Sequence, residues 1–132
     1  MREYLFHGKR LDNGEWVEGS FILVGNYYIL GMDWPYLNSQ VIPETIGQFT
    51  GRLDAYDKRI FEGHIVRFYR TNSLGRTTVR VGKVAFDTYN GTPAFCVIDP
   101  TGCRWSFDSL GEVEVIGNIH DNHELLEVTP DE

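Results

Sequence analysis

The chain has 132 residues, of which 42% are hydrophobic and 14% aromatic, and its formal net charge is −7. This composition excludes a disordered chain and is typical of one compact unit with a packed interior. The longest apolar run, Phe21 to Val24, is far too short for a membrane helix, and the N-terminus lacks the apolar stretch of a signal peptide. We therefore expect a cytoplasmic protein with no membrane partner.

An N-terminal β-meander and its connection are predicted over residues 1–50. Three β-prone runs are separated by tight-turn signals at Asp12-Asn13-Gly14 and at Gly25-Asn26, and no helical periodicity competes with them. The connection that follows contains Pro35 and is irregular, because a proline forces the residue before it into an extended conformation. A short strand, a turn at Pro43 and an extended piece ending at Gly51 complete this part.

The second part, residues 51–132, begins with a polar loop in which Asp54 and Asp57 are placed to cap turns. Five short β-prone runs follow, and Gly-rich turns separate them; the runs cover residues 64–69, 80–88, 94–99, 103–107 and 112–119. This pattern predicts a small, half-open, five-stranded barrel of the SH3-like type, on which the N-terminal meander packs. Gly82 and Gly117 are predicted to mark bulges or sharp coiling of their strands.

A short C-terminal helix is predicted over residues 121–127. Asp121 stands at the N-cap and Glu124 three residues later, a spacing that resembles a capping box. Leu125 and Leu126 would hold the helix against the barrel.

Cys96 and Cys103 flank a turn formed by residues 99–102. If Asp99 pairs with Gly102, Cys103 faces Ile98; if Gly102 is a bulge, Cys103 pairs with Asp99 and points away from Cys96. Neither register places the two sulfur atoms opposite each other, so we expect two reduced, partly buried cysteines. Two cysteines alone also make no zinc framework.

The charge of the chain is unevenly distributed. Five cations and no acid lie between positions 67 and 83, whereas eight acids and no lysine or arginine lie from Asp108 onward; the five cations are Arg67, Arg70, Arg76, Arg80 and Lys83. Interleaved aromatic residues and arginines suit nucleic-acid binding, while a basic hairpin and an acidic C-terminal segment suit self-association. An ordinary solvated hairpin is the third interpretation. Arg80 and Lys83 share a face only if the strand is bulged at Gly82.

Histidines are the candidate residues for a chemical reaction. His64 stands at the start of a predicted strand without a ligand at metal-binding spacing, and we interpret it as an exposed residue. His120 and His123 could share one helix face, but a metal site would need further ligands from elsewhere in the chain. The chain also lacks a nucleophile elbow and a phosphate-binding glycine loop. We therefore assign no catalytic residue, no metal ligand and no cofactor.

Three strings in the chain resemble the YopX family of phage and prophage proteins. They are PETIGQFTG at residues 43–51, IFEGHIV at residues 60–66 and VIGNIHDNHELL at residues 115–126. The resemblance extends from the MRE start to the ELLE near the end. The chain departs from the family's pattern at two positions, since His64 stands where an aspartate is usual and His123 where a proline is usual.

The resemblance implies a phage-borne protein without an established biochemical activity. With the residues above, it predicts a non-enzymatic phage or prophage accessory protein that acts by binding, as a homo-oligomer. Nucleic acid or another phage or host protein is the candidate partner, through Arg67, Arg70, Arg76, Arg80 and Lys83. The alternative is a small metal-dependent or hydrolytic enzyme that uses His64, His120 or His123.

Overall fold

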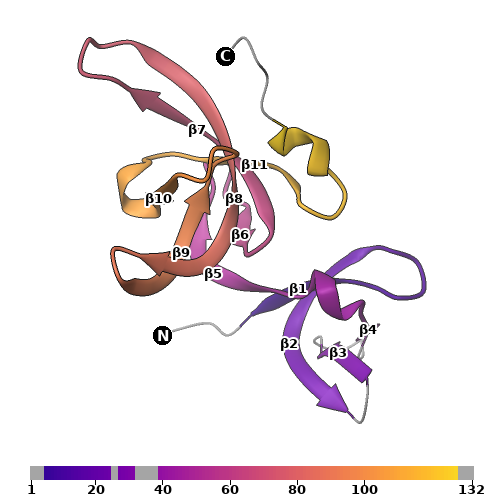
Figure 1. The fold of residues 1–132 in the computed structure, drawn as a ribbon. Helices are drawn as coiled ribbons and strands as arrows, with labels where there is room; N and C mark the ends of the chain where they lie inside the picture. Colours follow the sequence, from indigo (N-terminus) through magenta and orange to yellow (C-terminus); the bar gives the residue numbers. More distant parts are fainter. Residues whose placement is uncertain (1–4, 25–26, 32–38, 128–132) are drawn as a thin grey trace. The chain divides into compact units, whose positions relative to one another are not determined.

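The computed structural model describes residues 5–24, 27–31 and 39–127, and antiparallel β-sheets dominate it (Figure 1). The described residues contain no α-helix, only three short 3-10 helices. The prediction of a mainly β protein is therefore confirmed. The chain divides into two compact units, Met1–Gly51 and Arg52–Glu132.

The first unit is an antiparallel meander. Its sheet order is β4-β3-β2-β1-β5, and the elements are β1 (Phe6–Lys9), β2 (Trp16–Val24), β3 (Tyr27–Gly31), β4 (Ser39–Gln40), the 3-10 helix η1 (Pro43–Thr45) and β5 (Gly47–Leu53). The predicted strands around Asp12-Asn13-Gly14 are confirmed. The predicted turn at Gly25-Asn26 and most of the connection around Pro35 lie outside the described residues.

A few long-range contacts hold the meander together. The ring of buried His7 lies 4.6 Å from the ring of Trp16 on the paired strand. The Lys9 amide donates to Thr45 Oγ1 at 2.9 Å, and this hydroxyl in turn donates to the Ile42 carbonyl at 2.6 Å. These hydrogen bonds tie η1 to β1 and satisfy a buried hydroxyl.

The second unit contains the five predicted strands, in the sheet order β10-β9-β8-β7-β11. They are β7 (His64–Thr71), β8 (Thr77–Tyr89), β9 (Thr92–Ile98), β10 (Arg104–Ser106) and β11 (Glu114–Asn118), with the 3-10 helix η2 (Phe107–Ser109) before β11. One further strand, β6 (Arg59–Phe61), pairs with β5 and was not predicted. The described strands do not close into a barrel, because β10 and β11 stand at the two edges of the sheet.

The main core cluster of the second unit lies on one face of this sheet. Directly paired residues point to the same face, so Val66 and Phe68 of β7 face the core together with Val84 of β8 and Val97 of β9. All four are at most 2% exposed. Burying a side chain of this size stabilises the fold by about 1.5–3 kcal/mol, so this cluster dominates the packing.

Gly82 and Gly117 have different roles. The β7–β8 register runs without a shift from Ile65–Lys83 to Thr71–Thr77, so of the two predicted roles of Gly82, a bulge or sharp coiling, the bulge is absent. Gly82 instead permits a close approach, since an added Cβ would lie 2.6 Å from Val97 Cγ1 and 2.9 Å from the Ile98 carbonyl oxygen. At Gly117 the register with β7 does shift, which confirms the predicted bulge.

The predicted C-terminal α-helix is wrong in type and in cap. The chain forms a single 3-10 turn, η3 (His123–Leu126), whose N-cap is Asn122 and not Asp121. The reason lies in Asn118, whose Oδ1 accepts from the amides of His120 and Asp121, both at 2.9 Å. These bonds turn the chain before a longer helix can start. Leu125 and Leu126 are half-buried, and η3 lies against β8.

Around the cysteines, the second of the two registers is the observed one. The Asp99 amide donates to the Cys103 carbonyl, and Cys96 pairs with Ser106. Both cysteines are free, as predicted, but Cys96 is buried and Cys103 exposed, so the prediction that both are partly buried is wrong. No helix among the described residues is long and apolar enough to cross a membrane.

Candidate functional site

The β7–β8 hairpin extends beyond its neighbours as a two-stranded ribbon (Figure 1). Strand β11 pairs with β7 only from His64 to Arg67, and β9 pairs with β8 only from Lys83 onward. Between these limits the two strands pair with each other alone. We call residues 68–82 the arm.

The tip of the arm is an ordered turn. Asn72 Oδ1 accepts from the amides of Leu74 and Arg76 at 2.9 and 3.0 Å, and Gly75 adopts a φ of +81°. Asparagine side chains hold turns in this way, while glycine supplies the left-handed conformation. The tip therefore presents Leu74, which is 91% exposed, on a defined scaffold.

The register divides the five predicted cations between two faces of the hairpin. Arg70 and Arg80 lie on the same face as Phe68, the face of the core, while Arg67 and Lys83 lie on the opposite face. Arg76 belongs to the tip. Because no bulge occurs at Gly82, Arg80 and Lys83 lie on opposite faces, as the sequence predicts for an undisturbed strand.

Two of the five cations have partners within the protein. Arg67 forms an ion pair with Glu114 of β11, and the hydrogen bond and charge of this carboxylate hold the pKa of Arg67 above its usual range. The Arg70 guanidinium lies 4.2 Å from the centroid of the Trp105 ring and also contacts the Ser109 carbonyl. This cation–π contact leaves the positive charge in place, whereas the Arg67 charge is neutralised.

The remaining three cations are exposed. Arg76 and Arg80 form no ion pair with any residue that the structure describes, and Lys83 lies near Asp87. The arm as defined carries Arg70, Arg76 and Arg80 and no acid. Three of the five predicted cations therefore lie on the arm, whereas Arg67 and Lys83 lie outside it.

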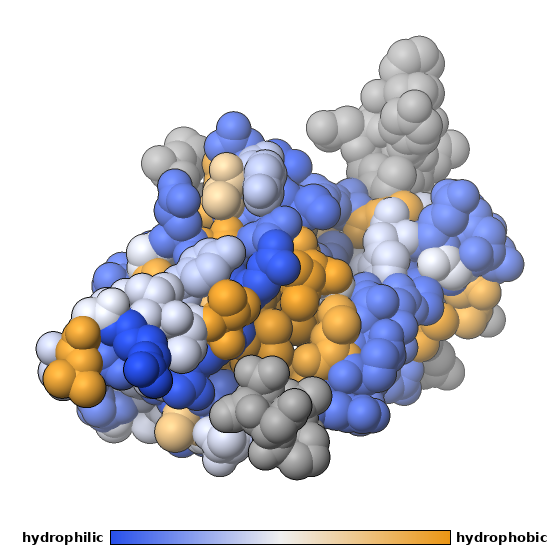
Figure 2. All heavy atoms as spheres, turned by 90° about the horizontal axis from the view of Figure 1, so that it is seen from above, coloured by the Kyte–Doolittle hydropathy of each residue, from blue (hydrophilic) through white to orange (hydrophobic). Residues whose placement is uncertain are grey.

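The arm also carries exposed apolar groups. Tyr69 and Val79 pair across the ribbon on the face away from the core and are 54% and 56% exposed. Figure 2 shows apolar side chains at the surface of the protein beside hydrophilic ones. The ribbon is therefore two-sided, with cations on the core side and apolar groups on the other.

A small cleft adjoins this apolar side within the second unit. Its volume is about 180 Å³, and it is lined by Ala55, Tyr56, Arg67, Tyr69, Glu112, Val113 and Glu114. The cleft has no signature in the sequence, because its residues come from three separate segments.

His64 is a structural residue, and its interpretation as an exposed residue is wrong. It is half-buried, its Nδ1 accepts from the Phe61 amide at 3.0 Å, and its ring meets the Phe61 ring edge-on. Burial and the charge of Lys58 lower the pKa of His64 to about 4, against an opposing effect of Asp54. The neutral ring thus caps the β6–β7 turn, where Gly63 has a φ of +95°.

His120 and His123 are both exposed. Across residues 5–24, 27–31 and 39–127, no three His, Cys, Asp or Glu side chains are placed to hold a metal ion.

The two buried carboxylates serve the fold. Asp54 Oδ1 accepts from the amides of Tyr56 and Lys58, and its Oδ2 accepts from the Val115 amide at 2.9 Å. Burial raises the pKa of Asp54, but these backbone hydrogen bonds outweigh it and bring the pKa below its usual value. The local turn cap was predicted, and the bond to β11 was not.

Asp99 plays the same part in the β9–β10 turn. It accepts hydrogen bonds from the Thr101 and Cys103 amides and from the Trp105 indole. Burial raises its pKa, whereas the Thr101 and Trp105 side chains and these amides lower it, and the net shift is downward. Asp99 thus fixes the indole ring of Trp105, the ring that the Arg70 guanidinium contacts.

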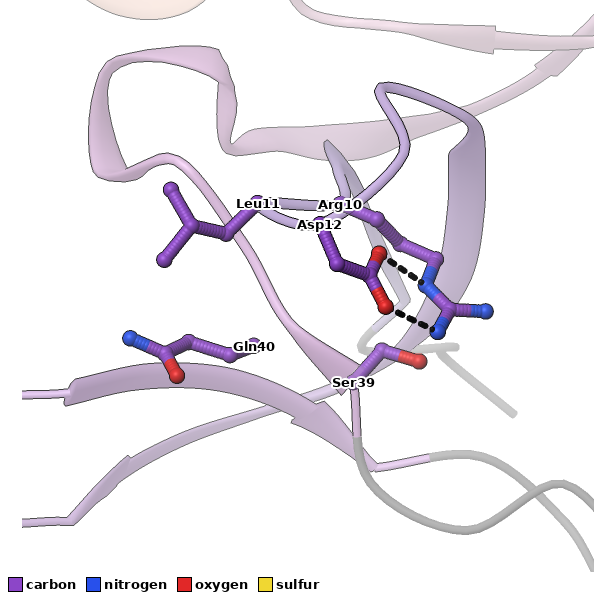
Figure 3. A pocket seen from close by; sticks show the side chains of 5 residues that line it. All are labelled: Arg10, Leu11, Asp12, Ser39 and Gln40. Carbon is purple, nitrogen blue, oxygen red and sulfur yellow. Dashed lines mark hydrogen bonds and ion pairs between the residues drawn. The ribbon is translucent and has the colours of Figure 1, made fainter.

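A larger hollow lies in the first unit and is shown in Figure 3. Its volume is about 340 Å³, and it is lined by Arg10, Leu11, Asp12, Ser39 and Gln40. The Arg10 guanidinium is engaged by Asp12 through two hydrogen bonds of 3.1 and 2.8 Å. The lining thus combines a hydroxyl, Ser39, with a carboxylate, Asp12, that is already engaged by Arg10.

The comparisons with known proteins agree with the strings noted in the sequence. A search of curated proteins finds no match to the chain. The family model described as "YopX protein" matches residues 10–127, which is most of the chain. On this match the chain belongs to the YopX family, a phage-associated family of unknown function.

Proposed function

We propose that this protein acts by binding, and that the arm contacts nucleic acid. The observation that carries the proposal is the group of three arginines, Arg70, Arg76 and Arg80, on a projecting ribbon without an acid. A two-stranded β-ribbon has the dimensions of the major groove of DNA, and arginines bind phosphate oxygens. The acidic remainder of the chain is screened beyond about 8–10 Å at physiological salt.

The expected salt dependence follows from the number of cations. Three phosphate contacts release about three counterions, so affinity should fall roughly 20- to 40-fold between 50 and 200 mM salt. Fluorescence anisotropy with labelled single-stranded and duplex oligonucleotides at both salt concentrations measures this fall.

Two matched double variants separate the effect of the arm's cations on binding from the effect of the protein's net charge. The double variant Arg76→Gln/Arg80→Gln removes two charges from the arm, whereas Thr88→Glu/Thr92→Glu changes net charge equally at exposed positions of the β8–β9 hairpin. The first should lose most of the affinity and most of the salt dependence, and the second should lose little. Equal binding by wild type and the glutamine variant would refute the proposal, as would no binding at 50 mM salt.

The arm sits on a unit that we infer to be an SH3-like half-open barrel. The strand order supports this, since four strands run as a meander and the fifth returns beside the first, with η2 before it.

Self-association is the second candidate, and the open strand edges of the arm favour it. Beyond Arg67 and Lys83 the outer edges of β7 and β8 pair with no other described strand. Such edges invite a further strand, and the exposed acids Glu112, Glu124 and Glu127 of a second copy would complement the arm's charge. Light scattering at low and high salt tests this: a monomer at every concentration would refute it.

A further inference from the structure

The cleft beside the arm combines two exposed tyrosines with a cation. Tyr56 is 73% exposed and Tyr69 is 54% exposed, and both line the cleft together with Arg67. Both also lie close enough to Arg67 to contribute to the rise of its pKa. Aromatic rings that stand free in solvent beside an arginine are a feature of sites that bind flat, unsaturated groups.

The fold holds these residues in place. The Tyr56 amide is fixed by Asp54, which also binds the amide of Val115 on β11. Tyr69 is paired with Val79 within the ribbon, two residues along the same face from Arg67. A turn and a strand that are distant in sequence thus bring one tyrosine each to the same cleft.

We propose that this cleft accepts an unpaired nucleobase of single-stranded nucleic acid. The inference rests on the proposed function: the cleft lies on the apolar face of the ribbon and the cations of the arm on its other face and tip, so the bound strand would pass around the edge of the ribbon. A base inside a duplex has both faces stacked and cannot enter such a cleft, whereas an unstacked base is free to pack against tyrosine.

The size and polarity of the cleft fit this ligand. A volume of about 180 Å³ is below the roughly 300–1,000 Å³ of pockets for drug-sized molecules and suits a single ring system. At the rim, the carboxylates of Glu112 and Glu114 can accept hydrogen bonds from the N–H groups of a base. The ion pair with Arg67 keeps Glu114 from repelling a phosphate as a free charge.

The test compares Tyr56→Ala with Tyr56→Phe, which retains the ring. Both variants are assayed by fluorescence anisotropy against a labelled single-stranded 12-mer of mixed sequence and against the corresponding duplex. Tyr56→Ala should bind the single strand about 5- to 150-fold more weakly, because one stacked base is lost, and should bind the duplex as wild type does. Tyr56→Phe should match wild type on both. Circular dichroism confirms that each variant is folded.

The outcomes separate this inference from the proposed function. If Tyr56→Ala binds the single strand as tightly as wild type does, or weakens duplex binding equally, the inference is wrong while the role of the arm stands. If Arg76→Gln/Arg80→Gln leaves binding unchanged, the role of the arm is wrong. If Tyr69→Ala reproduces the selective loss seen with Tyr56→Ala, both walls of the cleft contact the base.

Discussion

Replacement of Asp54 by asparagine tests how the second unit is held together. Asp54 is 7% exposed and accepts three backbone hydrogen bonds, two from its own turn and one, at 2.9 Å, from Val115. In Asp54→Asn the amide oxygen can keep the two bonds of the turn, and the amide nitrogen then faces the Val115 N–H, donor against donor. β11 would lose its bond to the turn.

The expected cost follows from those bonds. A hydrogen bond to a charged acceptor contributes about 1.5–3 kcal/mol, and a buried N–H left without a partner costs about 1–3 kcal/mol. These two quantities overlap, so we expect Asp54→Asn to lower the free energy of unfolding by about 2–4 kcal/mol. The control is Asp57→Asn, three residues away at an exposed position with a φ of +62°, which asparagine tolerates. This variant should stay within about 0.5 kcal/mol of wild type.

Urea denaturation followed by tryptophan fluorescence measures both variants, and pH adds a second check. The folded-state pKa of Asp54 is lowered, so its stabilising effect is complete above the ordinary value of 3.8 and is lost as pH falls through the folded pKa. The difference in free energy of unfolding between wild type and Asp54→Asn should therefore become smaller below about pH 4. This account of Asp54 would be refuted if the two proteins were equally stable at pH 7, or if the difference in free energy of unfolding were the same at pH 2 as at pH 7.

Three further predictions concern single positions. Gly82→Ala should destabilise the protein by about 1–3 kcal/mol, measured by thermal melting, because the new methyl group overlaps the Ile98 backbone, which cannot move aside freely. By NMR titration His64 should remain neutral down to about pH 4, and stability should fall as pH drops from 6.5 toward 4, because the unfolded chain binds the proton first. A thiol reagent should modify exposed Cys103 in the native protein and spare buried Cys96, whose pKa burial raises.

Most strands could be predicted from the sequence because the turns between them are marked. The turns of the second unit contain glycine, and five of these, including Gly75 and Gly102, adopt positive φ. Strand β6 was missed because only Ile60 and Phe61 carry its apolar signal, inside a polar loop. The C-terminal helix was predicted wrongly because the local pattern suggested a cap at Asp121. Asn118 instead accepts a hydrogen bond from the Asp121 amide, and nothing in the sequence around Asn118 marks this role.

Only part of the candidate site could be predicted from the sequence. The run of cations was evident, but the faces on which they lie depend on register, and the unshifted pairing at Gly82 separates Lys83 from Arg80. The neutralisation of Arg67 depends on Glu114, 47 residues away. The cleft likewise joins Tyr56 to residues of β7 and β11, and no local pattern relates them.

His64 shows how a departure from a family pattern can preserve a structure. The position accepts a hydrogen bond from the Phe61 amide, and an aspartate, usual there in the resemblance noted above, is also an acceptor. A neutral imidazole can take that place because its Nδ1 accepts this hydrogen bond, and a pKa lowered to about 4 keeps the ring neutral at physiological pH. The substitution is therefore consistent with a turn cap, and a catalytic interpretation is not needed to explain the residue.

The arm itself is the strongest argument for a partner. A two-stranded ribbon without further strands is marginally stable. In the arm, moreover, three apolar side chains face solvent, since Tyr69, Val79 and Leu74 are each more than half exposed. It is nevertheless held by Trp105 under Arg70 at its base, by the Thr71–Thr77 hydroxyl pair and by Asn72 at the tip. Such supports would be superfluous in a hairpin that only connects two strands. They are what a protruding contact element needs, because a ribbon that is already ordered loses less conformational entropy when it binds.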